Sequence, residues 1–377
     1  MKKLLIASAV SALFAAPATV LAQAKPAPAP TLDKVLEASG ISVSGYIDAG
    51  YTYAKNGAGF TDRVFDTQQN SFALNQFGLS VAKQPKEGFG GLVNLTVGRD
   101  AQVIHSFPEP QPGGSMFDIT QAYLQYAGGP LTVIAGKFVT LQGSEVIWSP
   151  SNTNISRSIL FGAIPFTHTG VRATWALSDT VSLIAGVNNG WDQLTDSNKG
   201  KTVELGATLN PIKPLSIVVS GYSGQESITG TSAPGGPQGT RTSLNAVVSY
   251  AIIDPLSVGL EVLDVSQDTV GNNKAKYNGV AAYVTYMFMP KLRGVLRAES
   301  FDDKNGFHFG TGVPAAFATS DTKYKEVTAT VSFLANDSFE ARAEVRRDQA
   351  NNPVFTDSTG ATSKNMTSVA LQGLYKF

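Results

Sequence analysis

Twelve charged side chains stand at alternate positions in segments where apolar and polar residues otherwise alternate. They are Asp48, Arg172, Glu204, Glu261, Arg293, Arg297, Glu299, Glu326, Glu340, Arg342, Glu344 and Arg346. Successive side chains of a β-strand point to opposite faces, so this spacing places all twelve on one face of a sheet. Such charges could set ion preference in a narrow aqueous passage, or they could pair across neighbouring strands and rigidify the wall.

Two further charges, Glu145 and Arg157, lie in the polar segment 141–165, which also carries apolar side chains such as Trp148 and Phe161. Long loops are usually functional or mobile, and a loop with this much apolar surface is expected to pack on an inner wall. We therefore predict that it folds inward, narrows a channel and places both charges near the constriction. The alternative is an external loop that packs on its neighbours or at a subunit contact.

The predicted pore residues combine this loop with the charges of the segments near 291–301, 323–335 and 338–347, which we expect to oppose it, and with the lumen charge Arg172. They are Glu145, Arg157, Arg172, Arg293, Arg297, Glu299, Glu326, Glu340, Arg342, Glu344 and Arg346. The twelve strand charges comprise five basic and seven acidic residues. This near balance predicts weak ion selectivity and leaves its sign open.

Catalytic and metal-binding arrangements find little support in the sequence. The chain has no cysteine, which excludes thiolate metal sites and thiol catalysis. His168 could pair with Ser144 or Ser158, but nothing in the spacing selects either pairing. No G-x-S-x-G elbow, zinc-ligand spacing or phosphate-cradling glycine loop occurs. We expect no enzymatic activity, no metal and no cofactor.

The elements that must position these charges are sixteen segments with a period of two residues. In one of them, Val203, Leu205 and Ala207 alternate with polar residues. Each segment has roughly the ten residues that a tilted strand needs to cross a bilayer. We predict strands near 41–54, 71–82, 89–99, 118–127, 131–140, 166–177, 180–189, 201–210, 215–223, 241–252, 256–266, 278–288, 291–301, 323–335, 338–347 and 365–377.

The connections between these segments alternate between short turns and long polar loops. Short turns such as 128–130 and 289–290 are rich in Gly, Pro, Asn and Asp, whereas 224–240 and 302–322 are long. Short turns at one rim and long loops at the other are typical of an outer-membrane barrel. We predict an all-β, transmembrane, antiparallel up-and-down barrel of about 16 strands, with 14 or 18 as alternatives.

Aromatic residues of the apolar face gather beside the short turns, as in the interfacial girdle of a membrane protein. They are Phe89, Tyr126, Trp175, Tyr250, Tyr286, Phe288, Phe333, Phe339, Tyr375 and Phe377. The competing fold is a secreted soluble β-sandwich or solenoid, in which strands also alternate. A sandwich does not require charges to avoid one face of every strand, whereas a lipid-facing surface does.

The N-terminal segment predicts export. Lys2 and Lys3 precede a short apolar run, and Val20 and Ala22 are the small residues of a cleavage site. We therefore assign residues 1–22 to a signal peptide, 23–40 to an Ala/Pro spacer with a short helix, and 41–377 to the barrel. Because basic and acidic residues are equally numerous, net charge predicts no nucleic-acid partner.

Several segments carry a family resemblance, including 71–76, 118–126, 131–137 and 164–191. The chain resembles the OmpL-like β-barrel porins of Gram-negative outer membranes, most densely between 41 and 192. The resemblance implies an outer-membrane location and porin function, and it assigns no functional residues. The strand ending at Phe377 is similar to the C-terminal signal by which the barrel assembly machinery recognises such proteins.

These observations together predict a passive diffusion channel for small hydrophilic solutes and ions. Its partners would be outer-membrane lipid, the assembly machinery and the solutes themselves, and the likeness to trimeric porins suggests a homotrimer. The alternative is a non-conducting structural or surface-binding barrel, whose loops would carry the function.

Overall fold

The computed structural model describes residues 31–54, 62–108, 114–228, 238–269, 271, 273–310 and 315–377. The chain divides into two units, Met1–Ser39 and Gly40–Phe377. In the first unit, α1 spans Leu32–Ser39. The predicted signal peptide of residues 1–22 and the spacer of residues 23–30 lie outside the described residues. In the part of the chain that is described, no helix is long and apolar enough to cross a bilayer.

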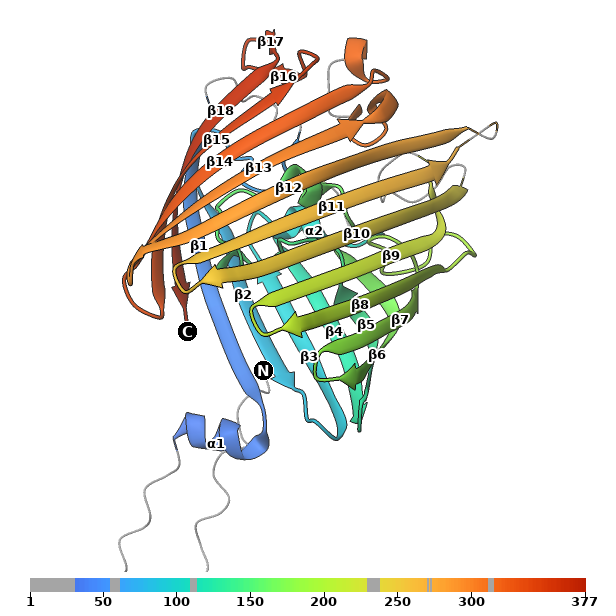
Figure 1. The fold of residues 1–377 in the computed structure, drawn as a ribbon, viewed down its shortest axis with the longest axis vertical. Coiled ribbons are helices and arrows are strands. Elements are labelled where there is room, and N and C mark those ends of the chain that lie inside the picture. Colours follow the sequence, from blue (N-terminus) through green and yellow to red (C-terminus); the bar gives the residue numbers. More distant parts are fainter. Residues whose placement is uncertain are drawn as a thin grey trace, which may run out of the picture. The chain divides into compact units, whose positions relative to one another are not determined.

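Sixteen antiparallel strands of the second unit close into a barrel (Figure 1). The strands of the ring are β1 (Ser42–Ala54), β2 (Ser71–Lys83), β3 (Gly88–Val97), β4 (Phe117–Gly128), β5 (Leu131–Val139), β6 (Thr167–Ser178), β7 (Val181–Asn188), β8 (Thr202–Ile212), β9 (Leu215–Ser227), β10 (Gln238–Ile253), β11 (Leu256–Asp268), β12 (Lys274–Met289), β13 (Leu292–Asp303), β14 (Thr322–Leu334), β15 (Phe339–Ala350) and β18 (Asn365–Lys376). Each predicted strand is present, which confirms the count of sixteen and makes the alternatives of 14 and 18 wrong.

Short elements occupy the long connections. They are α2 (Ala101–Ile104), η1 (Ser149–Ser151), α3 (Ile159–Gly162), η3 (Lys304–Gly306), η5 (Ala315–Phe317), and the two-stranded hairpin of β16 (Phe355–Thr356) and β17 (Thr362–Ser363). All of them lie in connections that the sequence pattern predicts as long loops.

The seam of the barrel joins its first and last strands. β18 pairs with β15 on one side and with β1 on the other. Beyond the end of β18, the N–H of Phe377 donates to the carbonyl of Gly45, and the N–H of Gly45 donates back, both at 2.9 Å. Closure of this kind leaves no strand edge of the ring unpaired.

The two faces of the wall differ as the residue parity predicts. All ten aromatic residues expected at the outer rim have exposed side chains on the isolated chain. Of the twelve strand charges that the sequence pattern places on the inner face, eleven are buried, and the side chain of Arg293 is 17% exposed. An apolar outer face and an inward-directed polar face exclude the soluble sandwich, whose apolar faces would meet one another.

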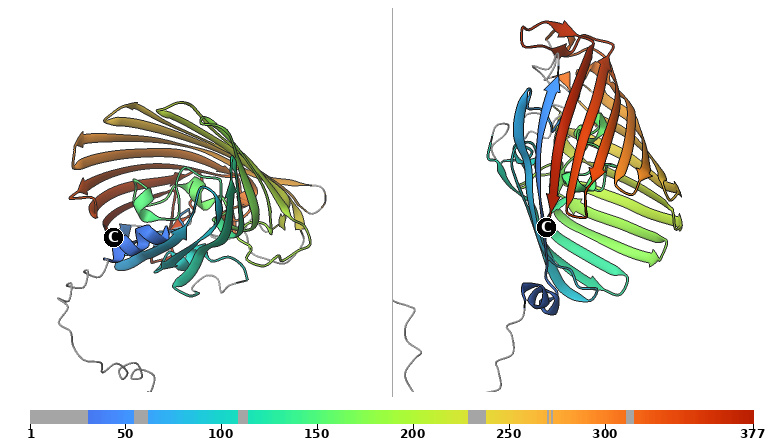
Figure 2. Two further views of the ribbon diagram at one scale, coloured as in Figure 1. Left: turned by 90° about the horizontal axis from the view of Figure 1, so that it is seen from below. Right: turned by 90° about the vertical axis from the view of Figure 1, so that its left-hand side faces the viewer.

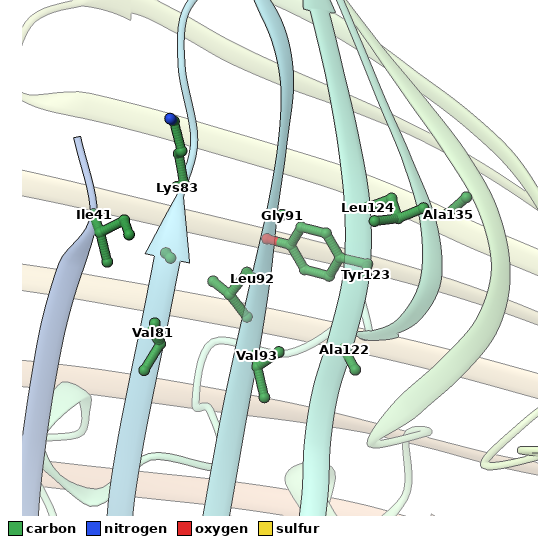
Figure 3. Close-up of a pocket in the computed structure, with 11 residues that line it drawn as sticks. Ile41, Val81, Lys83, Gly91, Leu92, Val93, Ala122, Tyr123, Leu124 and Ala135 are labelled. Atoms are coloured by element: carbon green, nitrogen blue, oxygen red, sulfur yellow. The ribbon is translucent and has the colours of Figure 1, made fainter. Parts of the chain in front are cut away.

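The outer face also carries shallow grooves. Figure 3 shows the one across β2 to β5, with a volume of about 510 Å³ and labelled residues that include Val81, Val93 and Leu124. These three side chains are exposed on the outer surface, and small residues such as Ala122 and Ala135 lie between them. An apolar groove on this face is suited to acyl chains and is a poor candidate for a hydrophilic solute.

A charge at mid-height on the outer face is expected to destabilise the barrel. Leu296 lies near the middle of β13 and is exposed. Leu296→Arg should lower the free energy of unfolding in phospholipid bilayers by about 2–4 kcal/mol, the cost of a cation at the bilayer midplane. The matched variant Phe288→Arg, at the short-turn end of β12, should cost only about 0–1 kcal/mol. Equal losses for the two variants in denaturant titrations would contradict a lipid-facing surface.

Long loops fold into the barrel and form an apolar core there. Figure 2 shows the green segment around α3 lying within the ring of strands. The buried cluster includes Ile159 and Leu160 of this segment together with Leu263, Val265 and Phe301 of the inner wall. The expectation of a polar inner face is therefore wrong on β11 to β13, where apolar side chains receive the loop.

Candidate functional site

The segment between β5 and β6, residues 140–166 (hereafter loop 3), crosses the inside of the barrel and contacts the far wall. Its helix α3 begins after Ser158, whose side chain accepts a hydrogen bond from the N–H of Phe161 at 3.0 Å. The free N–H groups of Ile159 and Leu160 donate to the carboxylate of Glu299 on β13, at 2.8 to 3.3 Å. The first N–H groups of a helix have no acceptor within the helix, and here a carboxylate of the barrel wall accepts them.

A second wall carboxylate holds the preceding turn. The N–H groups of Ile155 and Ser156 donate to Glu344 of β15 at 2.6 and 3.0 Å. The hydroxyl of Thr330 donates to the same carboxylate at 2.7 Å and accepts from the side chain of Asn154. Because the wall contacts peptide groups here, loop 3 is anchored through its backbone.

Arg297 connects loop 3 to two strands. Its guanidinium bonds to Glu145 of loop 3 at 2.7 Å, to Glu326 of β14 at 3.1 Å and to the carbonyl of Ser156 at 2.8 Å. The side chain is fully buried. Buried charges persist when they are paired and hydrogen-bonded, and Arg297 meets both conditions.

Arg157 does not face an open passage. Its guanidinium donates to the carbonyls of Val146, Ile155 and Ile147 within loop 3, at 2.9 to 3.1 Å. It also lies 5.3 Å from the ring centre of Phe65. Burial lowers the pKa of this guanidinium, and the nearby Glu145 opposes the shift. Arg157 thus braces the loop from inside.

The remaining charges near β15 extend the same network. Arg342 donates to the carbonyls of Ser149 and Asn154 at 3.3 and 3.2 Å. Glu340 accepts from both Arg342 and Arg293. Arg346 donates to the carbonyl of Arg157 and pairs with Asp348, at 2.6 and 2.7 Å.

Arg172 stands apart from this group. It pairs with Glu204 of β8 at 2.6 and 3.1 Å and lies over the ring of Phe138 at 4.3 Å. The structure therefore brings together ten of the eleven predicted pore residues, around loop 3, and places Arg172 on the wall formed by β5, β6 and β8. All but Arg293 are buried. Their assignment to an ion filter stays a prediction.

Sequence reasoning left several anchoring residues out of the predicted site. The N–H of Ser144 donates to Glu261 at 2.9 Å, and the N–H of Gly143 donates to the side chain of Asn245 at 3.1 Å. The hydroxyl of Tyr222 accepts from the N–H of Leu141 at 2.7 Å. The signal was present, because all three have inward parity on β9 to β11, close to the level of the other charges.

His168 forms no hydrogen bond with Ser144 or Ser158 among the described residues. His168 Nδ1 bonds to the carbonyl of Gly190 at 3.0 Å, and its ring packs on Tyr222. Ser158 caps α3. In the described ranges, no group of three or more His, Cys, Asp or Glu residues could hold a metal ion.

The interior is open on the short-turn side of loop 3. One cavity of about 360 Å³ is lined by Tyr46, Asn94, Trp148 and neighbours, and another of about 370 Å³ is lined by Ser144, Ser257, Tyr283 and neighbours. Both cavities include Ser151 of loop 3. The inward loop thus lies above two cavities that polar and apolar residues line together.

The comparisons with known proteins agree with this architecture. Residues 40–377 match the family described as "Putative beta-barrel porin-2, OmpL-like". No protein of curated function matches the chain in sequence.

Solved structures match over nearly the whole barrel. The high-pH structure of Pseudomonas putida OprB has a TM-score of 0.65 at 12% identity, covering 91% of this chain and 96% of its own. An anion-selective porin from Comamonas acidovorans has a TM-score of 0.62 at 12% identity, covering 89% and 99%. In-vitro folded OmpT of Vibrio cholerae, in its trimer form, has a TM-score of 0.57 at 11% identity, also covering 89% and 99%. At such identities, these likenesses show the fold alone.

Proposed function

Because the chain belongs to the OmpL-like family of β-barrel porins, we propose that it is an outer-membrane porin for the passive diffusion of small hydrophilic solutes and ions. The observation that carries the proposal is loop 3, folded inside a closed ring of sixteen strands. Barrels of this size enclose an aqueous lumen, and an inward loop divides it. The solute's own gradient supplies the driving force.

One observation favours the alternative of a non-conducting barrel. The wall charges at the level of loop 3 are buried and bonded to the loop. If that packing left no path for water, the loops rather than the lumen would carry the function.

Planar-bilayer recordings of the purified full chain test the choice between these functions. A diffusion channel should give discrete conductance steps that scale with salt concentration. A preparation that inserts as a folded barrel, shown by its heat-dependent gel mobility, yet gives no steps would overturn the porin proposal.

Arg293 is the predicted pore residue that we expect to act on permeating ions, because its side chain is partly exposed. Removing its positive charge with Arg293→Ala should shift the reversal potential in a salt gradient towards cation preference. Arg342→Ala is the matched variant, since that guanidinium is buried. A larger shift for Arg342→Ala than for Arg293→Ala would contradict this assignment.

Export, assembly and oligomeric state complete the proposal. We propose cleavage after Ala22 and recognition by the barrel assembly machinery through the strand ending at Phe377. A homotrimer is supported by the fold and by the trimer form of the OmpT structure. The mass of the mature chain tests cleavage, and sedimentation in detergent tests the homotrimer. Fractionation of cells that produce a variant without Phe377 tests recognition of the last strand, because this variant should be depleted from the outer membrane.

A further inference from the structure

The charges that would attract ions are used inside the barrel to hold loop 3. Glu299 and Glu344 accept backbone N–H groups, and Arg297 is enclosed by its partners. A permeating ion that loses water needs compensating charge or polar groups. Because these charges are already paired, they offer little recognition of a charged solute.

The inner wall between loop 3 and the short turns is lined instead by hydroxyl groups. Neighbouring strands place them directly opposite one another as Ser44 and Ser80, Thr132 and Thr174, Ser182 and Thr208, Ser216 and Ser249, and Ser257 and Thr285. All ten residues are at least partly exposed. The charges beside them include Arg293, which is paired with Glu340.

In the cavity of about 360 Å³, the indole ring of Trp148 provides a flat apolar surface beside hydroxyl groups of the wall. The indole N–H of Trp148 donates to Asn94 Oδ1 at 2.9 Å, which fixes the orientation of the ring. Pro150 and Leu92 also line the cavity. Its volume lies near the lower end of the ~300–1,000 Å³ typical of ligand pockets.

Polar groups that have no hydrogen-bond partner within the described residues lie around the indole ring. The hydroxyls of Ser44, Ser80 and Ser151 line the cavity and make no hydrogen bond within the described residues. Gln121 accepts from the N–H of Val139 through Oε1 and keeps its Nε2 donors. Lys376 is the charged residue among those that line the cavity, and it is exposed at the end of β18.

We infer that this cavity is a binding subsite for neutral, polyhydroxylated solutes of the size of a mono- or disaccharide, with Trp148 as the surface on which a sugar ring stacks. An aromatic ring offers a flat apolar surface on which a sugar ring can stack. Hydroxyl and amide groups fixed around it form hydrogen bonds with the hydroxyl groups of such a ligand. This inference rests on the proposed porin function and names its preferred solute class.

Equilibrium binding of maltose to the full chain in detergent tests the subsite. Maltose should give a saturable change in tryptophan fluorescence that is kept in Trp175→Phe, on the outer face, and lost in Trp148→Phe. Equilibrium dialysis with labelled maltose should show about tenfold weaker binding to Trp148→Ala, the loss typical of removing a central aromatic contact. Citrate, the charged probe, should give no saturable change.

A second variant guards against a folding defect at Trp148. The double variant Ser80→Ala and Ser151→Ala, which leaves the indole in place, should also weaken maltose binding. Absence of saturable maltose binding to the wild-type chain, or tighter binding of citrate, would overturn the inference. If the protein conducts but does not bind maltose, the subsite is overturned and the porin function stands. If it binds maltose but does not conduct, the porin function is overturned and the subsite stands.

Discussion

Replacing both Glu299 and Glu344 with alanine is expected to raise the single-channel conductance several-fold and to add fluctuating substates. These two carboxylates accept hydrogen bonds from four backbone N–H groups of loop 3. Each buried N–H left without an acceptor costs about 1–3 kcal/mol. Loop 3 should therefore leave its position, while the hydrogen-bonded ladder of the barrel is untouched.

Planar-bilayer recording gives the measurement, and Glu87→Ala provides the matched control. Glu87 is also a carboxylate that accepts a backbone N–H, from Gly129, but it lies on an exposed short turn. Removing its charge should leave the conductance near that of the wild type. If the double variant behaved like Glu87→Ala, loop 3 would be held by its apolar contacts alone, or would not limit the current.

The second large effect is expected from Arg297→Met, which removes the cation shared by loop 3, β13 and β14. The variant removes the guanidinium that Glu145 and Glu326 share, which leaves Glu145 without its ion pair and Glu326 with the 3.8 Å contact to Arg346. Breaking a buried ion pair from one side typically costs about 3–5 kcal/mol. The midpoint of denaturant-induced unfolding in lipid should fall accordingly.

Compensating substitutions make this prediction specific. Adding Glu145→Gln and Glu326→Gln to Arg297→Met removes the unpaired charges and should recover most of the lost stability. Arg293→Met, on the same strand but partly exposed, should cost much less. A loss that the two glutamine substitutions fail to relieve would show that packing around Arg297, rather than its charge, stabilises the site.

The ring of strands could be predicted from the sequence because its signal is local. Each crossing repeats every two residues, and the aromatic outer rim and inward charges follow from parity alone. Inward folding of loop 3 could also be predicted, because side chains such as Trp148 and Phe161 would otherwise meet water.

The contacts of the site could not be predicted in the same way. A loop has no periodicity, so parity gives no orientation for Arg157, whose guanidinium turns back onto its own loop. Parity gives Arg172 the same inward direction as the charges of β13 to β15, but the order of strands around the ring places β6 on the opposite side. The apolar patch at Leu263 and Val265 was visible as apolar residues at inward positions, and those departures from the pattern mark where the loop packs.

The backbone anchoring of loop 3 has a consequence for how such proteins can diversify. Since Glu299 and Glu344 bind peptide groups, any residue with a backbone N–H at positions 155, 156, 159 and 160 keeps these hydrogen bonds, although the side chains there are buried and constrained by packing. Proline is the exception, because it has no N–H to offer. New linings for the passage can therefore arise by mutation at the cavity-lining positions Ser151 and Thr153, outside the anchored residues, while the anchor stays constant.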